Sequence, residues 1–392
     1  MYIIIHYNKQ KSNSFAFELP FRFFAVYMII NKKNFTDKLI FFFYFYKMYG
    51  ISNFMKKLIF LIILLCLSIF DKSYAELTAG KFTNNPDVDA FVNKMHASHG
   101  FSKDYLYGIF DKTMHSGFTP KYMNKPAESV NNWAVYRKNM VNDIRLDLGV
   151  RYFKKHKTEL AKAQKQYGVP AHIIAGIIGM ETNYGYSPMK FRAVDSIATL
   201  AFYYPRRAEY FQRELEALFL FARKTDTDIF DIKSSYAGAV GIPQFMPSNV
   251  LTYAVSGTGD KHIDIINNHL DALFSVANFL KKKGWNTGEP VSMKVSVKGK
   301  KYYKYVTESP CNGYKVTVKT LKNAGVSFPF PVPDDTKVIL FTVHGANGKE
   351  YHAAFNNFCA VYRYNPSIHY VLGVNYLGNI VGSRAGAKLY SH

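Results

Sequence analysis

The chain has 392 residues, of which 48% are apolar and 17% aromatic, and its 50 Lys and Arg residues against 28 acids give a formal net charge of +22. This apolar content is sufficient for one large core or several packed subdomains, and it excludes a chain that is disordered throughout. The basic balance is compatible with an anionic partner, such as the cell wall or lipid headgroups, and equally with lysines that are spread over a solvated surface. No dense basic run supports nucleic-acid binding, so we expect none.

The amino-terminal part carries the features of an export signal. Basic residues at 55–57 precede the apolar run 58–70, and a small-x-small site ends at Ala75. An apolar run too short to span a bilayer comfortably, in this order, is typical of a cleaved signal peptide, so we assign residues 55–75 to one. We interpret residues 1–54 as a non-native upstream extension or a disordered segment, with a membrane-interacting extension as the alternative.

The rest of the chain predicts an α+β fold that is mainly helical. Helical periodicity with Pro and Gly punctuation dominates residues 76–290. Residues 291–355 contain stretches, such as 291–297, in which apolar and polar residues alternate with a period of two, which indicates a small β subdomain. Residues 356–392 return to a helical pattern, and we expect them to pack back on the helical core.

A helix that begins near Pro170 carries the strongest catalytic candidate. Its residues are apolar nearly all round, which predicts a buried helix, yet Glu181 lies at its far end on the same face as Ile174 and Ile177. Apolar neighbours and the negative end of the helix dipole both favour a protonated carboxyl group, which is a general acid. The structural alternative is a glutamate that caps the helix end or pairs with an arginine.

Two further segments offer polar contacts to a ligand. The loop 235–248 is rich in small residues that allow close approach, and Ser235 and Gln244 offer neutral hydrogen bonds. Arg206 and Arg207 lie in the first turn of a helix, against the usual charge preference, which favours an anionic or polar partner nearby. The alternatives are an ordinary connecting loop and a solvated arginine pair. A cleft for carbohydrate combines such neutral hydrogen-bonding groups with aromatic rings on which the sugar stacks, and Phe245, Tyr136, Tyr364 and Tyr370 could supply those rings.

Several co-linear motifs resemble the lytic murein transglycosylase B family. They are residues 176–182, residues 204–211, and residues 237–248, with 136–138 upstream and 364–370 near the end. The resemblance implies a lysozyme-like helical core with a helical subdomain and a small β subdomain. It also implies cleavage of the β-1,4 bond between N-acetylmuramic acid and N-acetylglucosamine in peptidoglycan, with formation of 1,6-anhydromuramic ends.

By this resemblance, Glu181 is a single acid/base that first protonates the glycosidic oxygen and then removes a proton from the muramic 6-hydroxyl. Ser235 would orient the N-acetyl group and Gln244 a sugar hydroxyl. The other substrate-binding residues that the resemblance implies are Phe245, Tyr136, Arg206, Arg207, Tyr364, Asn365 and Tyr370. Phe279 stands where the family often has a sugar-facing tyrosine, so one hydroxyl contact would be lost.

The family often carries an EF-hand-like calcium loop, which aligns with residues 256–267. Here Ser256 replaces the usual first Asp, Lys261 the turn glycine and Asn267 the final acid, so calcium binding is in doubt and we expect no required cofactor and no metal site.

The alternatives in function are a muramidase-type hydrolase and a noncatalytic wall-binding protein. We expect a periplasmic monomer that acts on peptidoglycan glycan strands. Contacts with cell-wall synthesis or division proteins, and association with the outer or inner membrane, stay open. Cys311 and Cys359 follow the signal peptide, and their spacing excludes neither a disulfide nor two buried thiols.

Overall fold

A computed structural model describes residues 82–123, 132–260, 263–313 and 315–387, which all belong to one compact unit, Glu76–His392. The expected upstream extension and signal peptide, residues 1–75, lie outside the described residues. Among the helices of the described ranges, none is both long and apolar enough to cross a bilayer.

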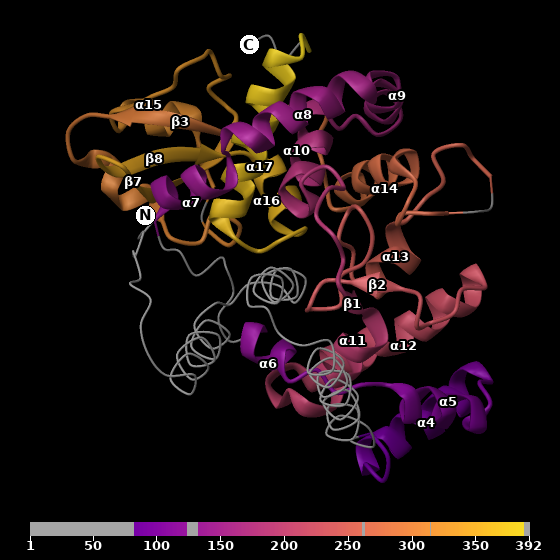
Figure 1. The fold of residues 1–392 in the computed structure, drawn as a ribbon. Coiled ribbons are helices and arrows are strands. Elements are labelled where there is room, and N and C mark those ends of the chain that lie inside the picture. The colour runs from indigo at the N-terminus through magenta and orange to yellow at the C-terminus, as the bar shows by residue number, and fades with distance from the viewer. Residues whose placement is uncertain (1–81, 124–131, 261–262, 314, 388–392) are drawn as a thin grey trace, which may run out of the picture. The chain divides into compact units, whose positions relative to one another are not determined.

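Helices make up most of the described chain, so the mainly helical α+β fold class is confirmed (Figure 1). Six of the described helices begin at an Asn or Ser whose side chain accepts a hydrogen bond from a first-turn backbone N–H: Asn85, Ser102, Asn132, Asn142, Asn268 and Ser367. The helices before the sheet are α4 (Pro86–His99), α5 (Lys103–Lys112), α6 (Phe118–Met123), α7 (Trp133–Met140), α8 (Asp143–Lys155), α9 (Lys157–Tyr167), α10 (Ala171–Thr182), α11 (Ala193–Tyr203), α12 (Ala208–Thr225), α13 (Pro247–Tyr253) and α14 (His269–Lys282).

Helix α10 forms the centre of this helical body and packs against the last helix, α17 (Ile368–Arg384). The two helices approach so closely that a Cβ atom on Gly176 would lie 2.7 Å from the Val374 carbonyl oxygen. A Cβ atom on Gly378 would lie 2.4 Å from the His172 carbonyl oxygen. Glycine at both positions therefore permits the crossing that sets the position of α10.

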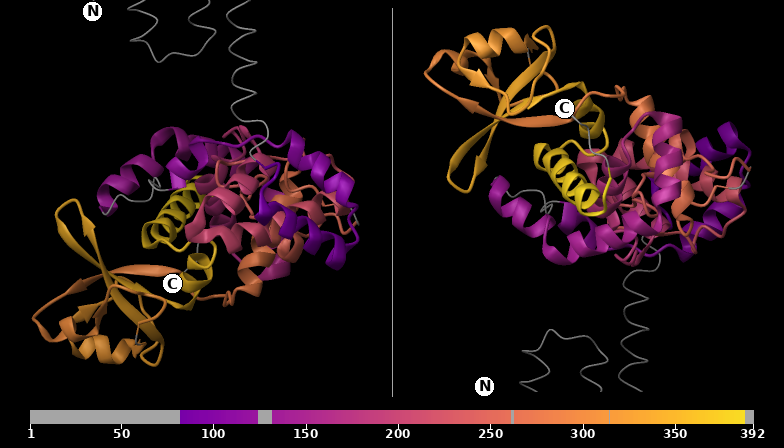
Figure 2. Two further views of the ribbon diagram at one scale, coloured as in Figure 1. Left: turned by 90° about the horizontal axis from the view of Figure 1, so that it is seen from below. Right: turned by 90° about the horizontal axis from the view of Figure 1, so that it is seen from above.

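A six-stranded sheet lies at one end of the helical body, beside α17 and α7 (Figure 2). The strand order is β4-β7-β8-β3-β6, and β5 pairs with β7. The strands are β3 (Ser292–Val297), β4 (Val306–Thr307), β5 (Val316–Thr317), β6 (Val326–Ser327), β7 (Lys337–Gly345) and β8 (Gly348–Ala354), with the 3-10 helix η3 (Lys301–Tyr305) and helix α15 (Val318–Asn323) between them. Strand β7 is buried on both faces: Phe341 joins the large helical core, while Leu340 joins a separate smaller core.

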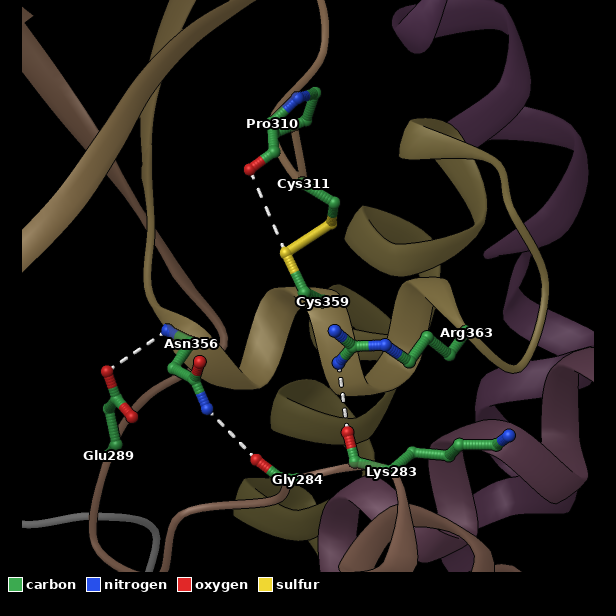
Figure 3. Close-up of a disulfide and its surroundings, with 8 residues drawn as sticks. All are labelled: Lys283, Gly284, Glu289, Pro310, Cys311, Asn356, Cys359 and Arg363. Carbon is green, nitrogen blue, oxygen red and sulfur yellow. Dashed lines mark hydrogen bonds between the residues drawn. A yellow bond between two sulfur atoms is a disulfide. The ribbon is translucent and has the colours of Figure 1, made fainter. Parts of the chain in front are cut away.

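Helix α16 (Asn356–Tyr362) fastens the sheet to the helical body (Figure 3). The Asn356 backbone N–H donates to Glu289 Oε1 at 3.0 Å, and the Asn356 side chain donates to the Gly284 carbonyl oxygen at 2.9 Å. Cys359 on this helix forms a disulfide with Cys311, which lies between β4 and β5. The structure thus resolves the alternative that the cysteine spacing left open, in favour of the disulfide.

Candidate active site

Glu181 is the penultimate residue of α10 and lies where this buried helix reaches the surface. All residues of the helix are buried except Ala171 at its start and Glu181, which are half-buried. The helix ends at Asn183 (φ 50°), and Tyr184 (φ 63°) also has left-handed backbone, so the chain turns sharply away after Thr182. Glu181 is therefore presented to solvent from a rigid support.

Tyr370 on α17 is a direct partner of this carboxyl group. Its hydroxyl donates to Glu181 Oε1 at 2.6 Å, and the tyrosine itself is only 3% exposed. Burial, followed by the nearby Glu181 charge, raises the pKa of Tyr370 well above its ordinary value. The phenol consequently stays protonated and remains a hydrogen-bond donor to Glu181 at any physiological pH.

A cleft of about 240 Å³ opens beside Glu181 and contains both neutral residues expected from the 235–248 loop. Ser235 Oγ accepts from the Ala239 backbone N–H at 3.2 Å, and Gln244 Nε2 donates to the Gly241 carbonyl oxygen at 3.0 Å. These bonds to their own loop fix both side chains at the cleft wall. Gln244 also has positive φ, at 52°, which is uncommon for a residue with a side chain.

The loop is held by one contact to the end of α10 and by another to Ile265, in the segment before α14. Thr182 Oγ1, next to Glu181, donates to the Ile242 carbonyl oxygen at 3.0 Å. Gly241 has φ of 72°, and a Cβ atom there would lie 2.5 Å from the Ile265 carbonyl oxygen. The position of the loop relative to Glu181 is thus set by a hydrogen bond from the buried Thr182 side chain and by a close backbone contact.

The aromatic residues expected as stacking faces lie mostly inside the protein. Phe245 and Phe279 are 1% and 2% exposed, and Tyr136 is 4% exposed. Phe279 packs edge-on against the Tyr364 ring with 4.8 Å between centroids, and the Tyr364 hydroxyl donates to the Pro243 carbonyl oxygen. The expectation of open ring faces at Phe245 and Phe279 is therefore corrected. The rings of Phe245 and Phe279 are instead packed in the core, where both contact the Tyr364 ring.

Arg206, Arg207 and Asn365 do not line the Glu181 cleft. The two arginines lie exposed in the 3-10 helix η2 (Pro205–Arg207), and the Arg207 guanidinium lies 4.1 Å from the centroid of the Tyr210 ring. Asn365 lies half-buried in the turn before α17. These three residues could meet only a substrate that extends beyond the cleft.

One wall of the cleft was not expected from the sequence. Residues 187–191 line it together with Tyr236, and Lys190 contributes an exposed cation. They reach this place because the two-residue strands β1 (Phe191–Arg192) and β2 (Lys233–Ser234) pair antiparallel, Phe191 opposite Ser234. A strand of two residues is too short to show an alternation of apolar and polar residues, so this strand pairing could not be predicted from the sequence.

The segment that aligns with a calcium loop uses its oxygen atoms internally. Ser256 Oγ donates to Asp260 Oδ1 at 3.1 Å, and Asp264 Oδ1 accepts from the Ile266 and Asn267 backbone N–H groups. Within the described ranges, no group of three or more His, Cys, Asp or Glu side chains is arranged to hold a metal ion. The described residues of this loop thus offer a hydroxyl at Ser256 and an amide at Asn267 where a calcium loop normally supplies acids, which is a poor donor set for calcium.

Comparison with known proteins agrees with the fold and shows the family of this chain. Residues 83–379 match the family described as the transglycosylase SLT domain. The chain is 36% identical over 315 residues to membrane-bound lytic murein transglycosylase B of Escherichia coli K12, covering 77% of this chain and 84% of that protein.

Two crystal structures extend the similarity to three dimensions. The soluble lytic transglycosylase SltB1 from Pseudomonas aeruginosa is 37% identical with a TM-score of 0.71, covering 77% of this chain and all of that one. The Escherichia coli lytic transglycosylase Slt35 in complex with calcium is 35% identical with a TM-score of 0.71, covering 78% of this chain and 96% of that one.

Proposed function

The chain belongs to the transglycosylase SLT domain family and is a peptidoglycan lytic transglycosylase, and on this premise we propose that Glu181 alone performs both proton transfers of the reaction. The products would be a strand with an N-acetylglucosamine end and a strand with a 1,6-anhydromuramic end. The observation that carries the proposal is the position of Glu181 at the surface end of a buried helix, in a cleft with neutral polar walls.

In the first step, protonated Glu181 gives its proton to the oxygen of the β-1,4 bond, and the bond from that oxygen to muramic C1 breaks. The N-acetylglucosamine end leaves as a neutral alcohol. Glu181 is now a carboxylate, and its negative charge stabilises the positive charge that develops at C1. The Tyr370 hydroxyl, 2.6 Å from Glu181 Oε1, stabilises this carboxylate and holds its orientation.

In the second step, the same carboxylate takes the proton from the muramic 6-hydroxyl, whose oxygen bonds to C1. Glu181 regains its proton, so the cycle closes without a second acid. Most glycosidases use two carboxylates that flank the bond, and substrate-assisted enzymes are an exception. Among the described residues that line the cleft, Glu181 is the only carboxylate, which supports the one-carboxylate route.

Ser235 and Gln244 are the substrate contacts that this proposal retains at the cleft. Ser235 would position the N-acetyl group and Gln244 a sugar hydroxyl. Their bonds to the 235–248 loop support this assignment, because side chains that are already fixed lose little entropy on binding. Tyr364, Tyr370, Phe245, Phe279 and Tyr136 would act behind the surface by supporting the wall.

We place the enzyme in the periplasm. The signal-peptide pattern of residues 55–75 and the Cys311–Cys359 disulfide both support export to an oxidising compartment. Fractionation of cells that express the full chain tests this: recovery with cytoplasmic markers, with uncleaved amino terminus, would contradict it.

The mechanism is tested by digestion of purified peptidoglycan with mass analysis of the released muropeptides. The wild type should release anhydro-ended products, and Glu181→Gln should release none, because an amide cannot donate and reclaim the proton. Glu308→Gln, an exposed glutamate outside the cleft, is the matched control and should act as the wild type. Reducing ends would instead identify a muramidase, and no product from the wild type would favour a protein that only binds the wall.

A further inference from the structure

A second and larger cleft lies on the other side of α17 from Glu181. It has a volume of about 640 Å³, within the range of small-ligand sites, and it lies between α7, α17 and the sheet. From α17 it is lined by Leu372, Asn375, Tyr376 and Asn379, which are spaced three and four residues apart and so form one stripe of the helix. Tyr370 lies on the opposite face, toward Glu181.

The cleft carries charges of both signs. The Arg137 guanidinium lies 5.3 Å from the centroid of the Tyr376 ring, and within the described ranges no ion pair joins it to a carboxylate. On the sheet side, Glu350 forms an ion pair with Lys294 at 3.1 Å, and both residues line the cleft. An available guanidinium beside an aromatic ring is suited to a ligand carboxylate.

A buried polar atom in the cleft wall also lacks a hydrogen-bond partner. His352 on β8 is only 6% exposed, and its Nε2 makes no hydrogen bond. The nearest charged oxygen is Glu350 Oε2 at 3.7 Å, beyond hydrogen-bond distance. Unsatisfied buried polar atoms are rare in native proteins because they are costly, and a ligand that enters the cleft would satisfy this one.

We infer that this second cleft binds the stem peptide of peptidoglycan, a short peptide with free carboxylates and one amino group; the inference rests on the proposed function. A neutral glycan presents no charge, so it would leave Arg137 without a counterpart. A stem peptide presents carboxylates to Arg137, and its alanine methyl groups and aliphatic chains match the apolar part of the wall, formed by Val291, Met293 and Leu372.

The two clefts lie within reach of one bound strand. Tyr370, at Glu181, and Tyr376, at the second cleft, lie about 9 Å apart along the axis of α17 and on opposite faces of a helix that is about 10–12 Å across, so a segment that joins the clefts must span about 14 Å or more. A peptide of three to five residues spans up to about 10–18 Å when extended. A muramic unit near Glu181 can therefore place its own peptide, or that of a neighbouring unit, beside Arg137.

The test is calorimetric titration of the full-length mature protein with the free tetrapeptide L-Ala-γ-D-Glu-diaminopimelate-D-Ala, and separately with chitotriose, which has no charge. We expect the tetrapeptide to bind wild type and Glu181→Gln equally. Arg137→Gln should bind it at least tenfold more weakly, while Arg151→Gln, which removes an exposed guanidinium elsewhere on the helical body, should bind it as the wild type.

Phe330→Ala removes a half-exposed ring from the rim without touching the core, and it keeps the test decisive if Arg137→Gln folds poorly. It should also weaken tetrapeptide binding. Absence of tetrapeptide binding by a wild type that digests peptidoglycan would overturn this inference alone. So would chitotriose binding that is sensitive to Arg137→Gln. A wild type that binds the tetrapeptide but releases no muropeptides would instead overturn the proposed function.

Discussion

The helical body and the sheet-bearing segment 292–354 are held together by different means. In the helical body, one continuous core includes α10 and α17, whose glycines let the backbones touch. The sheet has its own smaller core and is tied to the body by α16, by the shared strand β7 and by the Cys311–Cys359 disulfide. The close packing lies around Glu181, the proposed acid/base, whereas the disulfide lies where the sheet joins the helical body.

This difference assigns a separate task to each region. Catalysis loses much of its rate when a reacting group moves by an ångström, so Glu181 belongs on the best-packed helix. A cleft at the junction of two cores tolerates small movements and can accept a variable peptide. Three of the four changes below act on one region, and the fourth, acid, acts on both through a different histidine in each.

Removal of the disulfide should have the largest effect, and on the sheet side. Closing a loop of 48 residues is worth about 4 kcal/mol in the chain-entropy treatment. Cys311→Ser with Cys359→Ser should therefore lower the free energy of unfolding by up to that amount, measured by urea denaturation. If the double variant matched the wild type, α16 alone would be a sufficient tie.

Acid should weaken both regions, because each contains a buried neutral histidine. Burial lowers the pKa of His172 on α10 and of His352 on β8 to about 4, against about 6.5 in an unfolded chain. In this window the unfolded state binds more protons, so stability is complete above pH 6.5 and falls as the pH drops toward 4, by up to about 3 kcal/mol per group.

Thermal melts of the wild type, His172→Gln and His352→Gln between pH 7 and 4 measure the two contributions separately. Each variant should show a shallower loss of melting temperature with falling pH than the wild type. An unchanged slope in both would mean that other groups cause the acid sensitivity.

Gly378→Ala should disturb the helical body alone. The new methyl group would lie 2.4 Å from the His172 carbonyl oxygen, so α17 must shift away from α10, which costs about 1–3 kcal/mol. Because α17 also carries Tyr370, peptidoglycan digestion should slow as well. The control is Gly386→Ala, because Gly386 lies just beyond the end of α17 and a methyl group there would meet no other atom within 4 Å. Its positive φ predicts a modest loss of stability for this control, but its activity should match that of the wild type.

Tyr370→Phe should have the smallest effect on stability and act on the rate. It removes one charge-assisted hydrogen bond to Glu181, worth about 1.5–3 kcal/mol, and should lower kcat by roughly tenfold or more. KM should change little, since the ring stays in place. A raised KM with unchanged kcat would show that Tyr370 serves binding rather than the carboxyl group.

Local signals made the catalytic helix predictable from the sequence, whereas pairing over long distances hid much of the rest. The apolar run before Glu181 and the small residues of 235–248 indicated a cleft, and Ser235 and Gln244 do line it. An aromatic residue in a motif gives no sign of which way its ring points, so the burial of Phe245 and Phe279 could not be foreseen.

The strands show the same limit. Alternation indicated a strand over 291–297, where β3 lies. The short strand β5 covers only Val316 and Thr317, and Val318 already begins α15. The second cleft, which combines α7, α17, β3 and β8, has no local signature at all.

The hydrogen bond from Tyr370 to Glu181 joins residues 189 positions apart, and the tyrosine lies on the last helix of the chain. During synthesis, Glu181 leaves the ribosome long before its partner exists, and α10 lacks the helix against which it packs. A nascent or prematurely terminated chain therefore has no assembled catalytic centre. The pair of Glu181 and Tyr370 forms only after α17 has been synthesised.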